Sequence, residues 1–157
     1  MTFERLVREQ RVVREPTARD EIEELRALVR RYLADAAIEE LSPDGRFERA
    51  YGAARTLATM VVRASGYRVR QPGAHYNTFL ALEAADPKAF ADYVAYFDIC
   101  RTLRNELSYE SAEVISETEL AEILRKVPEF KEAGECWVTK NHPELGRLRA
   151  PEPEGTL

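Results

Sequence analysis

Three helix-start signals constrain the fold of this chain more than any other feature. The signals are Ser42-Pro43, Asp86-Pro87 and Ser116 with Glu119. Serine or aspartate caps the free N–H groups of a first helical turn, proline fits the first helical position, and Ser-x-x-Glu forms a capping box. Apolar residues recur at helical spacing between these signals. The sequence therefore predicts an all-α fold.

Five helical segments follow from these signals and from the apolar spacing. The segments are 17 to about 36, 43 to about 64, about 75 to 85, 87 to 108, and 116 onward. The first begins at Thr17, whose hydroxyl is placed to cap it, and Asp20 completes a capping-box-like pattern. Pro128 lies inside the last segment and is predicted to kink or split it. Residues 66–73 (GYRVRQPG) are a predicted loop.

These segments form one domain, with a further part of the chain at each end. Residues 1–16 form a charged arm that ends at Pro16, and residues 17–140 form the helical bundle. Residues 141–157 contain prolines and glycines without a periodic pattern and are a predicted tail. A chain of 157 residues is long enough to bury a core of its own.

The apolar stripes predict a single core and one unusual helix. The core members are Phe47, Tyr51, Leu57, Val61, Phe90, Val94 and Phe97. The segment 87–108 has a second apolar side, made by Tyr96, Ile99, Cys100, Leu103 and Leu107. Two apolar sides are typical of a helix at the centre of a bundle or in a two-fold interface. We therefore expect 87–108 to be the most buried helix and to contribute to a homodimer.

Composition excludes several classes of protein. The net charge is -5 and the pI near 5.3, whereas proteins that coat nucleic acid indiscriminately are strongly basic, so only a local basic site stays open. No apolar stretch approaches the roughly 20 residues that cross a bilayer, and no apolar signal-peptide core is seen, so we expect a cytoplasmic protein without a membrane partner. Cys100 and Cys136 form no metal-binding spacing and are predicted to be small core residues. No metal or other cofactor is expected.

The segment 87–108 also contains the main candidates for functional residues. Its core face, which includes Phe90 and Phe97, continues toward the C-terminus as Arg101, Arg104 and Asn105. An apolar face that becomes cationic without changing direction is unusual, because arginine is seldom buried unless it is paired. The structural interpretation is that these arginines pair with carboxylates or extend to the rim of the core.

Three stretches resemble the HEPN superfamily of small helical-bundle proteins. Residues 47–68 (FERAYGAARTLATMVVRASGYR) are similar to the second helix and following loop of a bacterial HEPN subgroup. Residues 73–76 (GAHY) are similar to its Gly-His-His-like element, with Ala74 in place of one histidine. Residues 93–109 (YVAYFDICRTLRNELSY) are similar to its motif helix, and the resemblance covers about residues 17–140.

The resemblance implies an up-and-down bundle of four to five helices, commonly a homodimer whose motif helices face each other. Ribonucleases of the superfamily carry an Arg-x4-6-His motif. The arginine neutralises the scissile phosphate, and the histidine moves a proton so that the ribose 2′-hydroxyl attacks. This chain keeps Arg104 and Asn105 but has Tyr109 at the histidine position, as the Arg-Asn-x-x-x-Tyr subgroup does. Tyrosine, with an ordinary pKa near 10, is a poor base at pH 7.

Arg101 is a candidate for binding RNA or phosphate together with Arg104, and three further residues are candidates as well. His75 either caps a backbone group at a helix start or replaces the missing base. Arg68 and Arg70 form either a basic rim for nucleic acid or part of a solvated loop, and the sequence favours neither interpretation. No zinc spacing and no glycine-rich phosphate loop occurs in the sequence.

These patterns favour a HEPN-like protein that binds RNA or a nucleotide through Arg104 and Asn105, with Tyr109 beside them and without rapid catalysis. By analogy with the superfamily, a nucleotidyltransferase is the expected partner in a toxin–antitoxin pair. The first alternative is an active metal-independent ribonuclease that uses Tyr109 or His75. The second is a structural dimer in which Arg101 and Arg104 form interface ion pairs.

Overall fold

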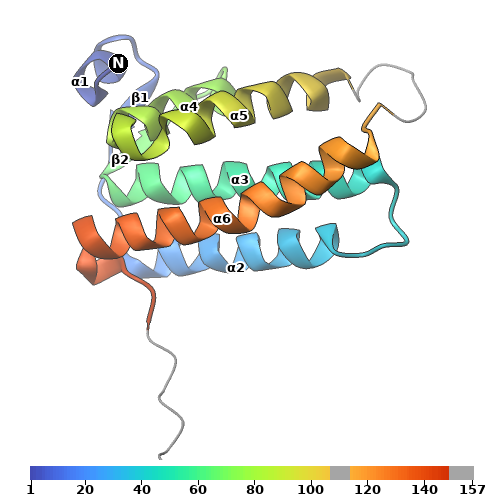
Figure 1. The fold of residues 1–157 in the computed structure, drawn as a ribbon. Coiled ribbons are helices and arrows are strands. Elements are labelled where there is room, and N and C mark those ends of the chain that lie inside the picture. The colour runs from blue at the N-terminus through green and yellow to red at the C-terminus, as the bar shows by residue number, and fades with distance from the viewer. Residues whose placement is uncertain (107–113, 149–157) are drawn as a thin grey trace, which may run out of the picture.

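Helices dominate the structure, as predicted for an all-α fold. The computed structural model describes residues 1–106 and 114–148 (Figure 1). The helices are α1 (Phe3–Arg8), α2 (Arg19–Ala36), α3 (Pro43–Ala64), α4 (Ala74–Ala85), α5 (Pro87–Glu106) and α6 (Glu117–Asn141), followed by a 3-10 turn over Pro143–Leu145. Two short strands, β1 (Val12–Arg14) and β2 (Tyr67–Val69), pair antiparallel with Val12 opposite Val69. This pair was not predicted.

Helix α3 lies at the centre of the bundle and contacts α2, α4, α5 and α6. The long helices α2, α3, α5 and α6 lie side by side with their axes roughly aligned, and their chain directions alternate (Figure 1). Small residues on α3 allow this close packing: a Cβ atom at Gly52 would lie 3.0 Å from the Tyr32 ring of α2. Most residues of α3 are buried, whereas few of α5 are. The prediction that segment 87–108 is the most buried helix was therefore wrong.

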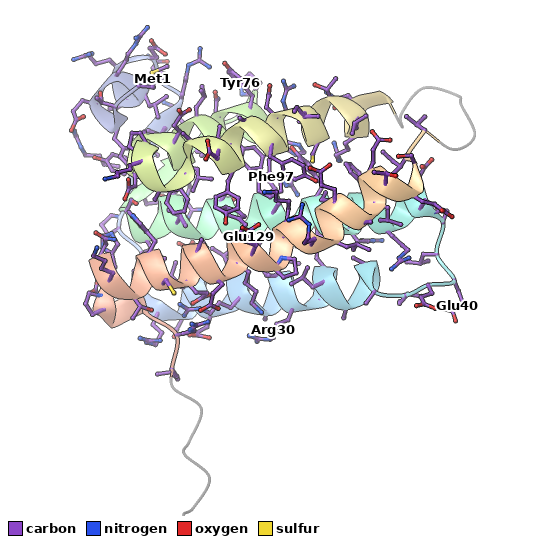
Figure 2. All side chains as sticks on the ribbon, in the orientation of Figure 1. Met1, Arg30, Glu40, Tyr76, Phe97 and Glu129 are labelled. Atoms are coloured by element: carbon purple, nitrogen blue, oxygen red, sulfur yellow. The ribbon has the colours of Figure 1, made fainter. Side chains whose placement is uncertain are left out.

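The predicted core is confirmed. All seven predicted side chains belong to one cluster, in which Val94 is half-buried and the others are buried. Phe97 lies near the middle of the bundle (Figure 2), with its ring centroid 5.2 Å from that of Phe130 and 5.7 Å from that of Phe79. On the second apolar side of α5, Cys100 is buried but Ile99 is 62% exposed. That side is thus only partly covered within the subunit.

Two local expectations were wrong, and a third was wrong in part. The N-cap of α2 is Ala18 rather than Thr17, whose hydroxyl instead donates to Glu21 at 2.7 Å. Pro128 does not split α6, which continues through it between the buried neighbours Val127 and Phe130, and a kink there stays a prediction. Cys136 is exposed, because it lies on the side of α6 opposite the core-facing positions.

Two buried arginines attach the N-terminal segment and the turn after α6 to the bundle. Arg63 of α3 donates to the carbonyl oxygens of Glu15, Pro16 and Tyr67 at 2.8–3.0 Å, and to the Glu21 carboxylate at 2.6 Å. The segment predicted as a charged arm is thus folded as α1 and β1 and attached to α3. Arg26 forms a two-bond ion pair with buried Glu135 and also donates to the carbonyl oxygen of Leu145 at 2.7 Å. This bond fixes the start of the predicted tail.

The position of Phe97 leads to a stability prediction. The Phe97→Ala variant should lower the free energy of unfolding by about 3–5 kcal/mol, because it removes a buried aromatic ring and leaves a cavity. Urea unfolding followed by circular dichroism measures this change. The Ile38→Ala variant, which truncates an exposed aliphatic side chain after α2, is the control and should change stability by less than about 0.5 kcal/mol. Equal losses in the two variants would contradict the core assignment.

Candidate phosphate-binding site

Tyr51 places a polar group in the core without a partner. Its side chain extends from the middle of α3 and is 1% exposed. Among the described residues, its hydroxyl has no hydrogen-bond partner. Burial raises the pKa of Tyr51 to about 12, against an opposing effect of the positive charges of Arg104, Arg55 and Arg101. The hydroxyl therefore keeps its proton at neutral pH and can donate it to a hydrogen-bond acceptor.

Arg55 lies one helical turn after Tyr51 on α3 and contacts His75 of α4. The contact joins the Arg55 Nη1 and His75 Nε2 atoms. Because a guanidinium can only donate, His75 Nε2 must accept, and the proton of the neutral ring is then on Nδ1. Burial, followed by the charges of Arg55, Arg104 and Arg101, holds the pKa of His75 below its ordinary value. His75 is thus a neutral side chain at pH 7, and it contacts a side chain rather than capping the backbone.

Arg104 of α5 completes the group. Its guanidinium carbon lies 5.8 Å from the centroid of the Tyr51 ring, and its side chain is one-third exposed. Among the described side chains, Glu48 is its carboxylate partner, with Oε1 3.7 Å from Arg104 Nε. This distance is that of a loose ion pair on the surface, so Glu48 neutralises Arg104 only weakly.

Tyr51, Arg55 and Arg104 line a hollow of about 200 Å³, here called the α3–α5 hollow. Its lining residues are Tyr32, Glu48, Arg49, Tyr51, Gly52, Arg55 and Arg104. Three arginines face one glutamate, so the lining carries a net positive charge within a chain that is negative overall. A second hollow of about 280 Å³ adjoins it on the other side of Arg55 and is lined in part by His75.

The structure does not bring all the predicted site residues together. Arg104 is brought together with Tyr51, Arg55 and His75. Arg68 forms ion pairs with Glu15 and Glu21 at the edge of the second hollow. Arg70 is exposed after β2 and does not line either hollow.

The other predicted residues of α5 have different surroundings. Arg101 forms an ion pair with Asp98 at 3.0 Å on the exposed side of α5. Asn105 is exposed at the end of the helix. Tyr109 lies outside the described residues.

Tyr51 and Arg55 were missed as functional residues by sequence reasoning. Tyr51 was assigned to the core because it lies at an apolar helical position. Arg55 was overlooked although it interrupts a run of buried small and apolar residues on α3. A charged residue within such a run is the signal that points to it.

No protein-family model matches the chain, and neither a curated protein nor a solved structure does. Within residues 1–106 and 114–148, no group of three His, Cys, Asp or Glu side chains is placed to hold a metal ion. In the same part of the chain, no helix has the length and apolar character needed to cross a membrane.

The unpartnered hydroxyl leads to a second prediction. The Tyr51→Phe variant should raise the free energy of unfolding by about 1–3 kcal/mol, because an unsatisfied buried hydroxyl destabilises the folded state by that amount. Urea unfolding measures the gain, and the control is Tyr76→Phe, which removes a hydroxyl from an exposed ring. A loss of stability in Tyr51→Phe would show that the hydroxyl has a partner within the protein.

Proposed function

We propose that this chain is a HEPN-like helical protein that binds a phosphate group of RNA or of a nucleotide in the α3–α5 hollow. The observation that carries the proposal is the buried Tyr51 hydroxyl, which has no hydrogen-bond partner among the described residues and lies near Arg55 and Arg104. A buried polar group without a partner destabilises a protein, and such groups occur where a ligand supplies the missing bond. A phosphate oxygen accepts from both a hydroxyl and a guanidinium.

The size of the hollow supports a phosphate group rather than a whole nucleotide. Pockets for drug-sized ligands are roughly 300–1,000 Å³, and this hollow is about 200 Å³. A phosphate would therefore lie inside it, while the sugar and base extend over the surface. The hollow attracts a phosphate although the whole chain is negative, since Arg49, Arg55 and Arg104 outnumber Glu48 in its lining.

The state of His75 favours binding over cleavage. A general base needs an available lone pair, and the Nε2 lone pair of His75 already accepts from Arg55. The depressed pKa of His75, caused by burial and by the neighbouring arginines, further weakens it as a base. Tyrosine, the residue type at position 109, holds its proton at neutral pH. We therefore propose that RNA is bound without rapid cleavage.

The exposed side of α5 supports a homodimer as part of the proposal. Ile99 is 62% exposed between the half-buried side chains of Tyr96 and Leu103. An exposed aliphatic side chain within an apolar stripe gives a second copy of the chain a surface on which to pack. Such a dimer would be isologous, with α5 of one subunit against α5 of the other.

Replacement of Arg104 tests the proposed function. The Arg104→Ala variant should bind a fluorescent single-stranded RNA at least about tenfold more weakly in fluorescence anisotropy, because a charge-assisted contact is lost. Arg104→Lys should not restore the affinity fully, since an ammonium group lacks the planar pair of donors. Binding by the unmodified protein should weaken as salt is added.

The control is Arg30→Ala, which removes an exposed arginine from α2 at the opposite edge of the bundle (Figure 2). It should change the affinity little. If the unmodified protein binds no RNA, no AMP and no pyrophosphate, the proposal is rejected. Loss of the dimer in Arg104→Ala, without any change in ligand binding, would support the structural alternative.

A further inference from the structure

Tyr76 is an exposed aromatic side chain next to the proposed phosphate site. It lies in the first turn of α4, directly after His75, and is 47% exposed. Two guanidinium groups lie near its ring: the Arg101 carbon is 5.6 Å and the Arg11 carbon 6.0 Å from the ring centroid. Figure 2 shows Tyr76 at the upper surface of the molecule, on the side opposite Arg30.

Both arginines are held in place by other side chains. Arg11 donates to Asn77 Oδ1 and to Glu9 Oε2, each at 2.9 Å. Arg101 donates to Asp98 Oδ1 at 3.0 Å. These carboxylates offset the charge of the arginines, so neither is suited to act mainly as a phosphate clamp. Their planar groups remain beside the ring, and arginine planes and aromatic rings are the surfaces on which nucleobases stack.

Tyr76 also borders a hollow of about 260 Å³ between α4 and α5, here called the α4–α5 hollow. Its lining residues are Tyr76, Phe79, Leu80, Glu83, Ala91, Val94, Ala95, Asp98 and Arg101. The lining combines apolar side chains with the carboxylates of Glu83 and Asp98, which outnumber the single arginine. Such a lining repels a phosphate and accepts a flat neutral group that carries N–H donors, which describes a nucleobase edge.

Helix α5 borders both hollows: Arg104 lines the α3–α5 hollow, and Arg101, one turn earlier, lines the α4–α5 hollow. Tyr76 also directly follows His75, whose ring contacts Arg55 of the α3–α5 hollow. We propose that Tyr76 and the α4–α5 hollow bind an unpaired nucleobase of the same ligand whose phosphate binds in the α3–α5 hollow. This inference rests on the proposed function and narrows it to nucleotides and single-stranded RNA, because paired bases are not free to stack on a protein.

The experiment compares Tyr76→Ala with the unmodified protein in fluorescence anisotropy. The probes are a short single-stranded RNA, the same RNA as a duplex, and an oligomer of the same length without bases. Stacking of one base contributes enough that alanine substitution should weaken single-stranded RNA binding roughly 5- to 150-fold. The base-free oligomer and pyrophosphate should bind both proteins equally. Tyr76→Phe keeps the ring and should bind like the unmodified protein.

Ile38→Ala is the matched control, since it truncates an apolar side chain of similar exposure elsewhere on the surface. A comparison of AMP with ribose 5-phosphate shows whether the base and the phosphate belong to one nucleotide. If the protein prefers AMP and Tyr76→Ala abolishes this preference, a single nucleotide occupies both hollows. Without that preference, a Tyr76-dependent loss on single-stranded RNA means that base and phosphate come from different nucleotides.

Two results would overturn the inference while leaving the proposed function intact. The first is unchanged single-stranded RNA binding by Tyr76→Ala when Arg104→Ala weakens it. The second is an equal loss on the single strand, the duplex and the base-free oligomer, which would mark Tyr76 as a support of the phosphate site. Failure of the proposed function is distinct, because pyrophosphate would then bind neither variant nor the unmodified protein.

Discussion

The close approach of α2 to the middle of α3 is the constraint on which the rest of the structure depends. Small residues on α3 allow this approach, and a Cβ atom at Gly52 would lie 3.0 Å from the Tyr32 ring, which is tighter than most real contacts. With α2 packed so closely on one side, α3 becomes the central helix and contacts α4, α5 and α6 on its others. Consequently Tyr51 and Arg55, which are one turn apart on α3, are held between α4 and α5.

This arrangement places polar side chains at positions where packing alone would favour apolar ones. Elsewhere in the described core, buried charges are paired: Arg63 with Glu21, and Arg26 with Glu135. Among the described residues, the Tyr51 hydroxyl has no hydrogen-bond partner, and Arg55 contacts the ring of His75. Buried polar groups are normally satisfied, so this local exception distinguishes the α3–α5 hollow from the structural ion pairs.

Much of the helical framework could be predicted from the sequence. Ser42-Pro43 and the capping box of Ser116 and Glu119 mark the starts of α3 and α6, and the apolar spacing identifies the core. These signals are local, so they can be read from consecutive residues. The pairing of β1 with β2 could not be read in this way, because three-residue strands are too short to show alternation.

The site was only partly predictable for the same reason. Arg104 stood out because it continues an apolar face, which is a local pattern. Its neighbours Tyr51 and Arg55 belong to a different helix, and tertiary packing alone brings them together. The opposite case is Arg101, whose position in the same pattern suggested a phosphate contact, whereas the structure pairs it with Asp98. The sequence pattern does not distinguish the two arginines.

The titration of His75, followed by NMR of its imidazole protons, tests the central claim most directly. The account predicts a pKa below the ordinary 6.5 in the free protein, because burial and the nearby arginines disfavour the charged ring. Saturating pyrophosphate should raise the pKa of His75, since the bound anion offsets those positive charges. The signals of His142, the second histidine, provide an internal reference that the ligand should leave unmoved. A His75 titration that pyrophosphate does not shift would contradict the account.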